Sequence, residues 1–389
     1  MRRPLKLRRS HRGFNLVEMM IAMTIGLMIV AGLTTIFSNT SNSQREMRRA
    51  SQQIENGRYA MDVLTQDIQV TGFYGQYRQY TTPATAPDPC SLVQADISNA
   101  IGLAIQGYNA ATISADPAVP ATCGALLPGT ATQNGSDVLV IRRADTQFVA
   151  IGATTLAGQY YTQANPTTLE LQLGGGAITC TSKADGATAA SVLRRLQYPN
   201  STDVCNGTSS PAGYIRQMHV HIYFVAPCSA PTGGAGAACD ATADNGNPIP
   251  TLKRIELTTD GTNPKWSDPL SIAEGVEFMK IAYGIDDTPT AVNADTGLIG
   301  DGAPDRYVLA PALADLSNAV TVRVDLLVRN SEPSAGFTDT KTYALGVDPV
   351  VNTNPAISVA ATSLDQRYRR HVYSSEIRLV NLASRKEIP

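Results

Sequence analysis

The feature that most constrains this chain of 389 residues is an uncharged apolar segment near its N-terminus. No residue from Met19 to Phe37 carries a charge. A helix rises about 1.5 Å per residue, so a helix from Phe14 to Phe37 spans about 36 Å, enough to cross the hydrocarbon core of a bilayer. We therefore predict a membrane-spanning helix in this segment.

The residues before Phe14 are strongly basic and include no acidic residue; their cations are Arg2, Arg3, Lys6, Arg8, Arg9 and Arg12. The positive-inside rule keeps such a cluster in the cytoplasm and sends the residues after Phe37 to the other side, which in a bacterium is the periplasm. Removing these six cations from the 31 basic residues leaves 25 against 33 acidic residues, a net charge of −8. A domain with this negative net charge binds phosphate backbones poorly, so we exclude nucleic acid as a partner.

One carboxylate, Glu18, lies inside the first turn of the predicted membrane helix. An ionisable side chain that faces lipid costs several kcal/mol, so an intramembrane carboxylate is by default a functional group with a partner. The sequence therefore predicts a cation that Glu18 meets.

All six cysteines follow the apolar segment, on the exported side where disulfides form and persist. An even number fits three disulfides, and many connectivities are open. We favour pairs of sequence neighbours, because each pair brackets a loop rich in Gly, Pro and Thr: Cys90 with Cys123, Cys180 with Cys205, and Cys228 with Cys239. The chain contains no C-x-x-C motif, so we interpret the cysteines as structural rather than redox-active or metal-binding.

The segment after the apolar run is polar but keeps helical spacing, with one predicted stripe formed by Met47, Ile54, Met61, Leu64 and Ile68. We predict a single helix from Phe14 to near Val70, ended by the sequence TGFYG. Gly26, Gly32 and Gly57 are the points where it could bend. Its amphipathic half should lie on a globular head, from which the apolar half should project.

Beyond Gly75 the chain consists of short alternating segments separated by Gly, Pro, Asn and Thr, which is the pattern of antiparallel strands. The clearest is AVTVRVDLLVRN; further candidates are RQMHVHIYFV, VLVIRR, TLELQL, LKRIELTT, VEFMKIAYGI and HVYSSEIRLVNL. We predict an α+β fold in which the long N-terminal helix packs on a strand-rich antiparallel head. Its predicted parts are a basic leader (1–13), a membrane helix (14–38), the amphipathic half of the helix (39–75) and the head with its disulfide-bearing loops (76–389).

The sequence offers little for catalysis or metal binding. It contains no P-loop, Rossmann fingerprint, H-E-x-x-H or G-x-S-x-G motif. His219 and His221 share one face of a predicted strand, and with no third ligand placed we favour a solvated strand face over a metal site.

An acidic, glycine-rich segment, DDTPTAVNADTGLIGDGAPDRY, contains weak calcium candidates in Asp295, Asp301 and Asp305. The spacing does not match an EF-hand loop, which closes with a bidentate Glu. We favour an acidic surface turn and predict no required cofactor.

The stretch HRGFNLVEMMIAMTIGLMIVAGL resembles a type III signal, the class of leader recognised by prepilin peptidase. The resemblance implies cleavage after Gly13, N-methylation of the new terminal Phe14 and retention of Glu18 inside the apolar helix. In pilins the glutamate is thought to pair with the N-terminal amine of a neighbouring subunit, so leader removal creates the cation that Glu18 needs. The continuation with ENGRYAMDVLTQDIQVTGFYG, the chain length and the disulfide-bearing head resemble the PilW family of type IV pilus minor pilins.

This resemblance implies a structural protein that helps to prime pilus assembly and performs no catalysis. The implied partners are other minor pilins, the major pilin, prepilin peptidase, the inner-membrane assembly platform and the inner membrane itself. The head would lie in the periplasm until assembly carries the protein into the pilus. The open alternatives are a type II secretion pseudopilin, a signal-anchored periplasmic enzyme and an adhesin.

Overall fold

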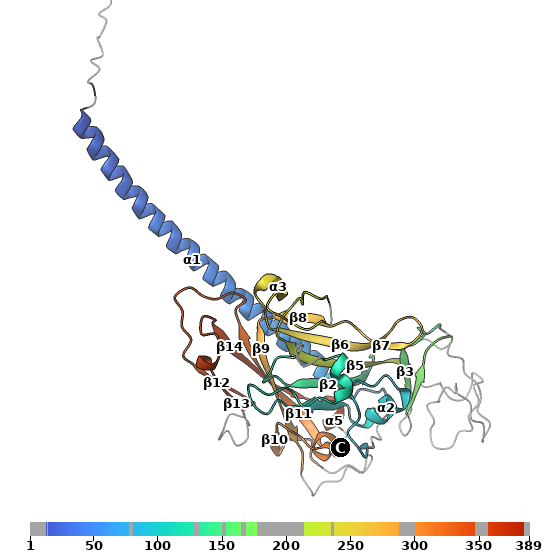
Figure 1. Ribbon diagram of the computed structural model, residues 1–389. Helices are drawn as coiled ribbons and strands as arrows, with labels where there is room; N and C mark the ends of the chain where they lie inside the picture. Colours follow the sequence, from blue (N-terminus) through green and yellow to red (C-terminus); the bar gives the residue numbers. More distant parts are fainter. Residues whose placement is uncertain are drawn as a thin grey trace, which may run out of the picture. The chain divides into compact units, whose positions relative to one another are not determined.

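The computed structural model describes residue 13 and residues 15–77, 81–127, 132–149, 153–164, 169–176, 214–234, 237–287, 300–346 and 357–384 (Figure 1). The chain divides into two compact units, Met1–Gln52 and Gln53–Pro389, and each is considered by itself. The described elements are one long helix, short helices and antiparallel strands, which confirms the predicted α+β class.

Helix α1 (Leu16–Gln69) extends over 54 residues, as the sequence predicted. Its apolar N-terminal segment has the length and composition to cross a membrane. The threonines in this segment donate their hydroxyl protons back to the helix: Thr34 Oγ1 lies 2.8 Å from the Val30 carbonyl oxygen, and Thr35 Oγ1 lies 2.7 Å from that of Ala31. These internal hydrogen bonds satisfy the hydroxyl donor of each threonine, which suits an apolar environment.

The last turns of α1 bury a different stripe from the predicted one, formed by Gln53, Gly57, Ala60, Leu64, Asp67 and Ile68. Leu64 and Ile68 are buried as expected, but Ile54 remains 48% exposed and Met47 65% exposed. The physical reason is Gly57, where a Cβ atom would lie 2.3 Å from Cε2 of Tyr373. A side chain as small as hydrogen lets the helix lie directly on this ring. The helix ends as predicted at TGFYG, where Gly72 adopts a positive φ of 72°.

The larger sheet has eight antiparallel strands in the order β1-β2-β5-β3-β4, with β6 beside β5, and β7 and β8 beside β6. Its strands are β1 (Ile105–Tyr108), β2 (Val138–Ala144), β3 (Tyr160–Ala164), β4 (Leu169–Leu173), β5 (Ile215–Ala226), β6 (Thr251–Thr259), β7 (Pro264–Trp266) and β8 (Leu270–Glu274). Each of the candidate segments VLVIRR, RQMHVHIYFV and LKRIELTT contributes one of them.

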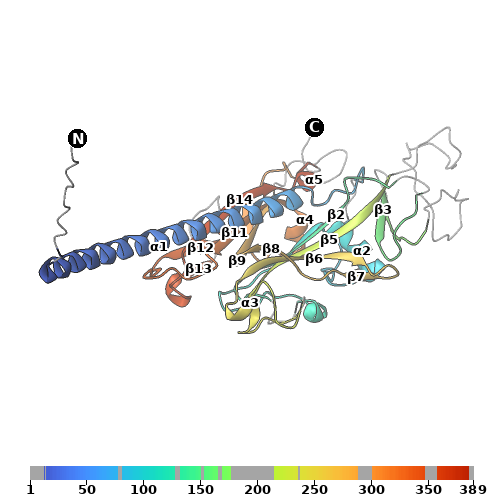
Figure 2. The same cartoon turned by 90° about the horizontal axis from the view of Figure 1, so that it is seen from above.

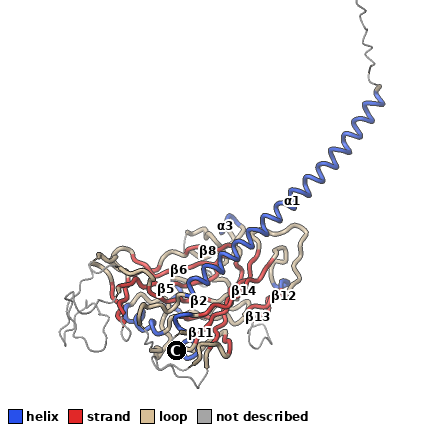
Figure 3. The backbone as a smooth tube through the Cα atoms, turned by 180° about the vertical axis from the view of Figure 1, so that it is seen from behind, coloured by secondary structure: helices blue, strands red, loops and turns tan. Residues whose placement is uncertain are grey.

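The second sheet has the order β10-β9-β11-β14. Figure 2 labels its strands β9, β11 and β14. Its strands are β9 (Val276–Ile285), β10 (Arg306–Val308), β11 (Ala319–Arg329) and β14 (Arg370–Arg378), and a separate pair is formed by β12 (Thr342–Leu345) and β13 (Ile357–Ala360). The short helices are α2 (Gln94–Asn99), α3 (Ala243–Gly246), α4 (Leu313–Ser317) and α5 (Val380–Ala383), with 3-10 turns at Ala100–Gly102, Ala121–Ala125 and Ala361–Ser363. Figure 3 colours the helices blue and the strands red, and labels α1 and α3. The end of the predicted strand HVYSSEIRLVNL is thus the helix α5.

Among the described residues, three large apolar clusters and one small cluster, Tyr161 with Ile215, hold the second unit together. The largest joins Leu64 and Ile68 of α1 to side chains of both sheets. A second lies among β2, β5 and β6 with the segment after α1. The third joins Phe278 and Leu327 to β12 and β13, so both faces of β11 are buried. Full burial of one such large apolar side chain is worth about 1.5–3 kcal/mol.

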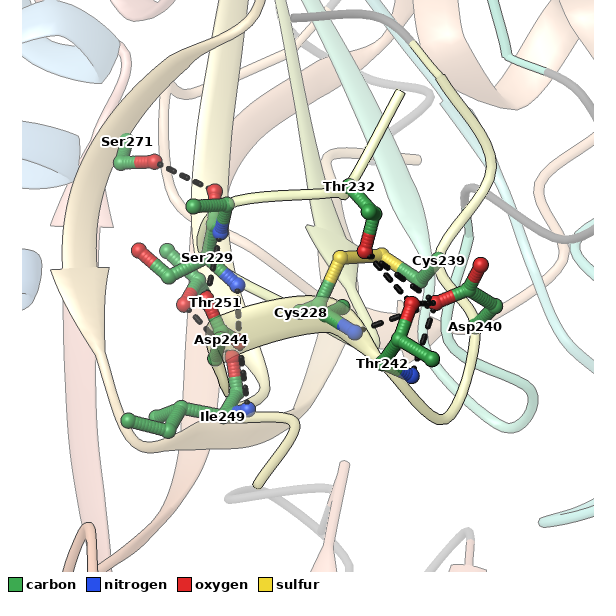
Figure 4. Close-up of a disulfide and its surroundings, with 12 residues drawn as sticks. Cys228, Ser229, Thr232, Cys239, Asp240, Thr242, Asp244, Ile249, Thr251 and Ser271 are labelled. Carbon is green, nitrogen blue, oxygen red and sulfur yellow. Dashed lines mark hydrogen bonds between the residues drawn. A yellow bond between two sulfur atoms is a disulfide. The ribbon is translucent and has the colours of Figure 1, made fainter. Parts of the chain in front are cut away.

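Within the described ranges of the second unit, two disulfides join its loops. Cys90 is bonded to Cys123 and Cys228 to Cys239, which are two of the three favoured pairs. Around the second bridge, the Asp244 carboxylate accepts hydrogen bonds from the backbone N–H groups of Ser229 (2.9 Å) and Ile249 (2.8 Å) (Figure 4). The third predicted pair, Cys180 with Cys205, lies outside the described residues.

Candidate functional site

The N-terminal end of α1 is organised around Glu18. The backbone N–H of Asn15 donates to Glu18 Oε2 at 3.3 Å, and the Asn15 carbonyl accepts from the Met19 N–H at 3.1 Å. A Glu three residues after the helix cap that reaches back to the cap N–H is half of a capping box. Sequence reasoning missed this local role, although Asn-x-x-Glu before an apolar run is its signal. Gly13 is exposed, and Phe14 lies outside the described residues.

The Glu18 carboxylate is exposed among exposed apolar side chains. Leu16 is 74% exposed and Met19 55% exposed, and the side chains of the following turns are similarly open. Among the residues that the structure describes, the hydrogen bond from Asn15 is the one polar contact of the Glu18 side chain. Apolar surroundings strengthen attraction to an external cation, because fewer water molecules compete with it. The arrangement can therefore receive a positive charge from outside the chain.

A second carboxylate of α1, Asp67, is almost fully buried and has three partners from the larger sheet. Asp67 Oδ1 accepts from Arg143 Nε at 2.9 Å, Oδ2 accepts from the Tyr223 hydroxyl at 2.8 Å, and His221 Nδ1 also contacts Oδ2. Burial by itself would raise the pKa of Asp67. The hydrogen bond and charge of His221, together with the charge of Arg143, outweigh burial and hold this pKa well below its ordinary value.

The interpretation of the two histidines as a solvated strand face is wrong for His221, which is 4% exposed. The end of α1 covers this face of β5, so His221 meets Asp67 there. His219 lies 3.5 Å from Asp145 Oδ2, and burial together with the nearby positive charges of Arg143 and His221 lowers its pKa. His221 thus joins β5 to α1 through Asp67, whereas His219 pairs with Asp145, which directly follows β2.

The calcium candidates are engaged in turns. Asp301 Oδ1 accepts from the Ala303 N–H at 2.9 Å, and Asp305 Oδ2 accepts from the Asp287 N–H at 2.7 Å. Asp295 lies outside the described residues. Within the described ranges, the one cluster of three possible metal ligands is Asp88 with Cys90 and Cys123, whose sulfur atoms are already joined in a disulfide.

A groove of about 780 Å³ lies between the loop 81–88 and α2. Its two carboxylates are used locally: Asp88 Oδ1 accepts from the Cys90 N–H at 2.9 Å, and Asp96 Oδ2 accepts from the Ser91 hydroxyl at 2.6 Å. The residues that the structure places along this groove include no Lys, Arg, His or Cys.

Comparison with known families gives two matches. Residues 8–34 match the prokaryotic N-terminal methylation motif, and residues 239–381 match the family described as type IV pilus-assembly protein W. No curated protein and no solved structure matches the chain. The two family matches confirm the resemblance inferred from the sequence, at the N-terminal segment and across the strands from β6 to β14.

Proposed function

We propose that this chain, a membrane-anchored and pilin-like protein related to type IV pili, is a minor pilin that helps to prime pilus assembly. The observation that carries the proposal is the N-methylation motif over residues 8–34 with Glu18 exposed inside the apolar helix that follows. The proposal assigns the protein a structural role without catalysis. The carboxylates of the described groove and of the Asp67 cluster are consistent with that role, because they accept hydrogen bonds within the chain.

Maturation would create the missing cation. Cleavage after Gly13 exposes the amine of Phe14, which in a neighbouring subunit would meet the Glu18 carboxylate. A charge pair in an apolar bundle is stable only when both members are matched, so one axial register between subunits is favoured. The expected neighbours are the other minor pilins and the major pilin, assembled on the inner-membrane platform with the head in the periplasm.

Deletion of the gene tests the assembly role. Surface pili should be lost or sharply reduced, and expression of the full chain from a plasmid should restore them. The measurement should be repeated in cells in which pilus retraction is blocked, because a priming defect and faster retraction both remove pili. Normal pili with a defect in protein secretion would instead assign the chain to a type II secretion system.

Terminal mass spectrometry tests the processing step. The mature chain should begin at Phe14 with an N-methyl group, since the resemblance to a type III signal implies cleavage after Gly13, within the residues 8–34 that match the methylation motif. A chain that still begins at Met1 in cells with active prepilin peptidase would contradict the proposal.

A further inference from the structure

A fully buried lysine lies in the second unit, outside the site described above. The Lys280 side chain of β9 has 0% exposure, and its Nζ donates to three oxygens: Asp137 Oδ1 (2.5 Å), Asn109 Oδ1 (2.6 Å) and the Ala110 carbonyl (2.8 Å). Asp137 is also buried and accepts further hydrogen bonds from the backbone N–H groups of Ala110 and Ile281, both at 2.9 Å. These contacts hold an amine, a carboxamide and a carboxyl group together.

The carboxamide of Asn109 presents its carbonyl side to the lysine. Oδ1 and the amide carbon Cγ are joined by a bond of about 1.23 Å, so a hydrogen bond of 2.6 Å places Nζ within about 3.8 Å of Cγ. Reacting atoms in pre-organised sites lie about 3–3.5 Å apart, so a small shift of either side chain brings the two atoms into reach.

We propose that Lys280 and Asn109 become joined by an isopeptide bond between Nζ and Cγ, with Asp137 carrying the proton. Asp137 takes one proton from the lysine ammonium, which leaves a lone pair on Nζ. Nζ attacks Cγ, and the bond from Cγ to Nδ2 breaks as Nδ2 is protonated. Of the three protons on Nζ, one stays on the new amide and two leave with Nδ2 as ammonium, so Asp137 ends as the carboxylate it was. The reaction consumes no oxidant, reductant or other reactant.

The surroundings of Asp137 favour the first proton transfer. Burial raises the pKa of Asp137 to about 6, even though the neighbouring Lys280 charge acts in the opposite direction. Transfer of a proton from the ammonium to this carboxylate replaces a buried charge pair with two neutral groups, which a low-dielectric site tolerates better. Asn109 itself is only half-buried, so the side of the site that must release ammonium is not closed.

The bond would connect two sheets covalently. Asn109 follows β1 of the eight-stranded sheet and Lys280 belongs to β9 of the four-stranded sheet, and the two residues are 171 positions apart in the chain. A second type of covalent link would thus reinforce a head that already carries disulfides. This inference does not depend on the proposed role in pili.

Mass spectrometry of the full chain, purified from membranes in detergent and then reduced, tests the bond. The intact protein should be lighter than its sequence by the mass of one ammonia, after the processing at the N-terminus is accounted for. Proteolysis should yield one branched peptide that contains both Asn109 and Lys280. Recovery of the two residues in separate, unmodified peptides would overturn the proposal.

Variants identify the residues that react. Asn109→Ala should abolish both the missing mass and the branched peptide, and Asp137→Asn should leave most of the chain unlinked. The matched control is Asn134→Ala, which removes an exposed amide that contacts the Ser114 carbonyl at 3.2 Å and should retain the link. If Asp137→Asn does not fold, Asn109→Ala tests the proposal by itself. In that variant a branched peptide on Lys280 can come only from another partner. A branched peptide that persists, in a chain lighter than its sequence by the mass of one water, would show that Asp137 reacts instead of Asn109.

Discussion

The first and the last turns of α1 each carry a carboxylate, and the two differ in exposure and in the origin of their partners. Glu18 is exposed among apolar side chains, where its one described polar contact is the N–H of Asn15. Asp67 is 7% exposed and is held by Arg143, His221 and Tyr223, residues that are 76 to 156 positions away in the sequence. The tertiary fold thus supplies the partners of Asp67, whereas the described contact of Glu18 comes from its own helix end, and the partner that we propose for it is the amine of a neighbouring subunit.

The apolar residues of the two regions differ in the same way. From Leu16 to Phe37 the large apolar side chains remain exposed, while Leu64 and Ile68 reach 0% exposure in the second unit. One helix therefore combines a segment whose apolar side chains are exposed and a segment that belongs to the core of the second unit. Variants in each segment should separate assembly from stability.

Replacement of Asp67 should have the largest effect on stability. Asp67→Ala leaves Arg143 and His221 without their shared carboxylate, and removing one partner of a buried ion pair costs about 3–5 kcal/mol. The free energy of unfolding can be followed in urea by the fluorescence of Trp266, the single tryptophan. The control is Asp62→Ala, an exposed carboxylate of the same helix, which should change the free energy by less than about 0.5 kcal/mol. Equal losses in both variants would remove the special role of Asp67.

The pH dependence of unfolding should identify the same carboxylate. The pKa of Asp67 is lowered in the folded protein, so its stabilising contribution is present above the unfolded value of about 3.9 and is lost as the pH falls below that value towards the folded one. Wild type should therefore lose stability more steeply below about pH 4 than Asp67→Asn, which cannot titrate at this position. Parallel curves in acid urea titrations would contradict the assignment.

Glycine replacements should distinguish the two segments of α1 more finely. Gly57→Ala places a methyl group against the Tyr373 ring, and overpacking of this kind costs about 1–3 kcal/mol. At Gly26 no atom outside its own stretch of helix lies within 4 Å of an added Cβ. Gly26→Ala should therefore leave the unfolding free energy of the second unit unchanged. The same urea titrations measure both, and a neutral Gly57→Ala would show that the helix can move away from the sheet at little cost.

Replacement of Glu18 should have the smallest effect on stability and a large one on assembly. Glu18→Ala should change the unfolding free energy by less than about 0.5 kcal/mol, because the side chain is exposed and its one described polar contact is the Asn15 N–H of its own helix end. It should still be cleaved after Gly13 but should lose crosslinks to partner pilins in isolated membranes. Glu18→Gln keeps hydrogen bonding without charge, so its crosslinking should be intermediate. Crosslinking of Glu18→Ala at the wild-type level would exclude the proposed ion pair.

Several elements could be predicted from the sequence because their signals are local. The uncharged run from Met19 to Phe37 determines a helix of membrane length, and the alternation in AVTVRVDLLVRN determines the strand β11. The turn TGFYG determines where α1 ends, because Gly72 adopts a positive φ there. Each of these signals is complete within one element, so no distant residue is needed to interpret it.

The faces that these elements bury were decided only by tertiary structure. His221 lies on a strand face that looks polar in sequence, yet α1 covers it and Asp67 meets it from 154 positions away. Gly57 joins the buried stripe because Tyr373 lies over it, and Lys280 reaches Asn109 because two sheets come together. Periodicity shows which residues of one element share a face. Whether that face meets solvent, a core or a partner charge depends on elements far away in the chain, and these are brought together only by packing.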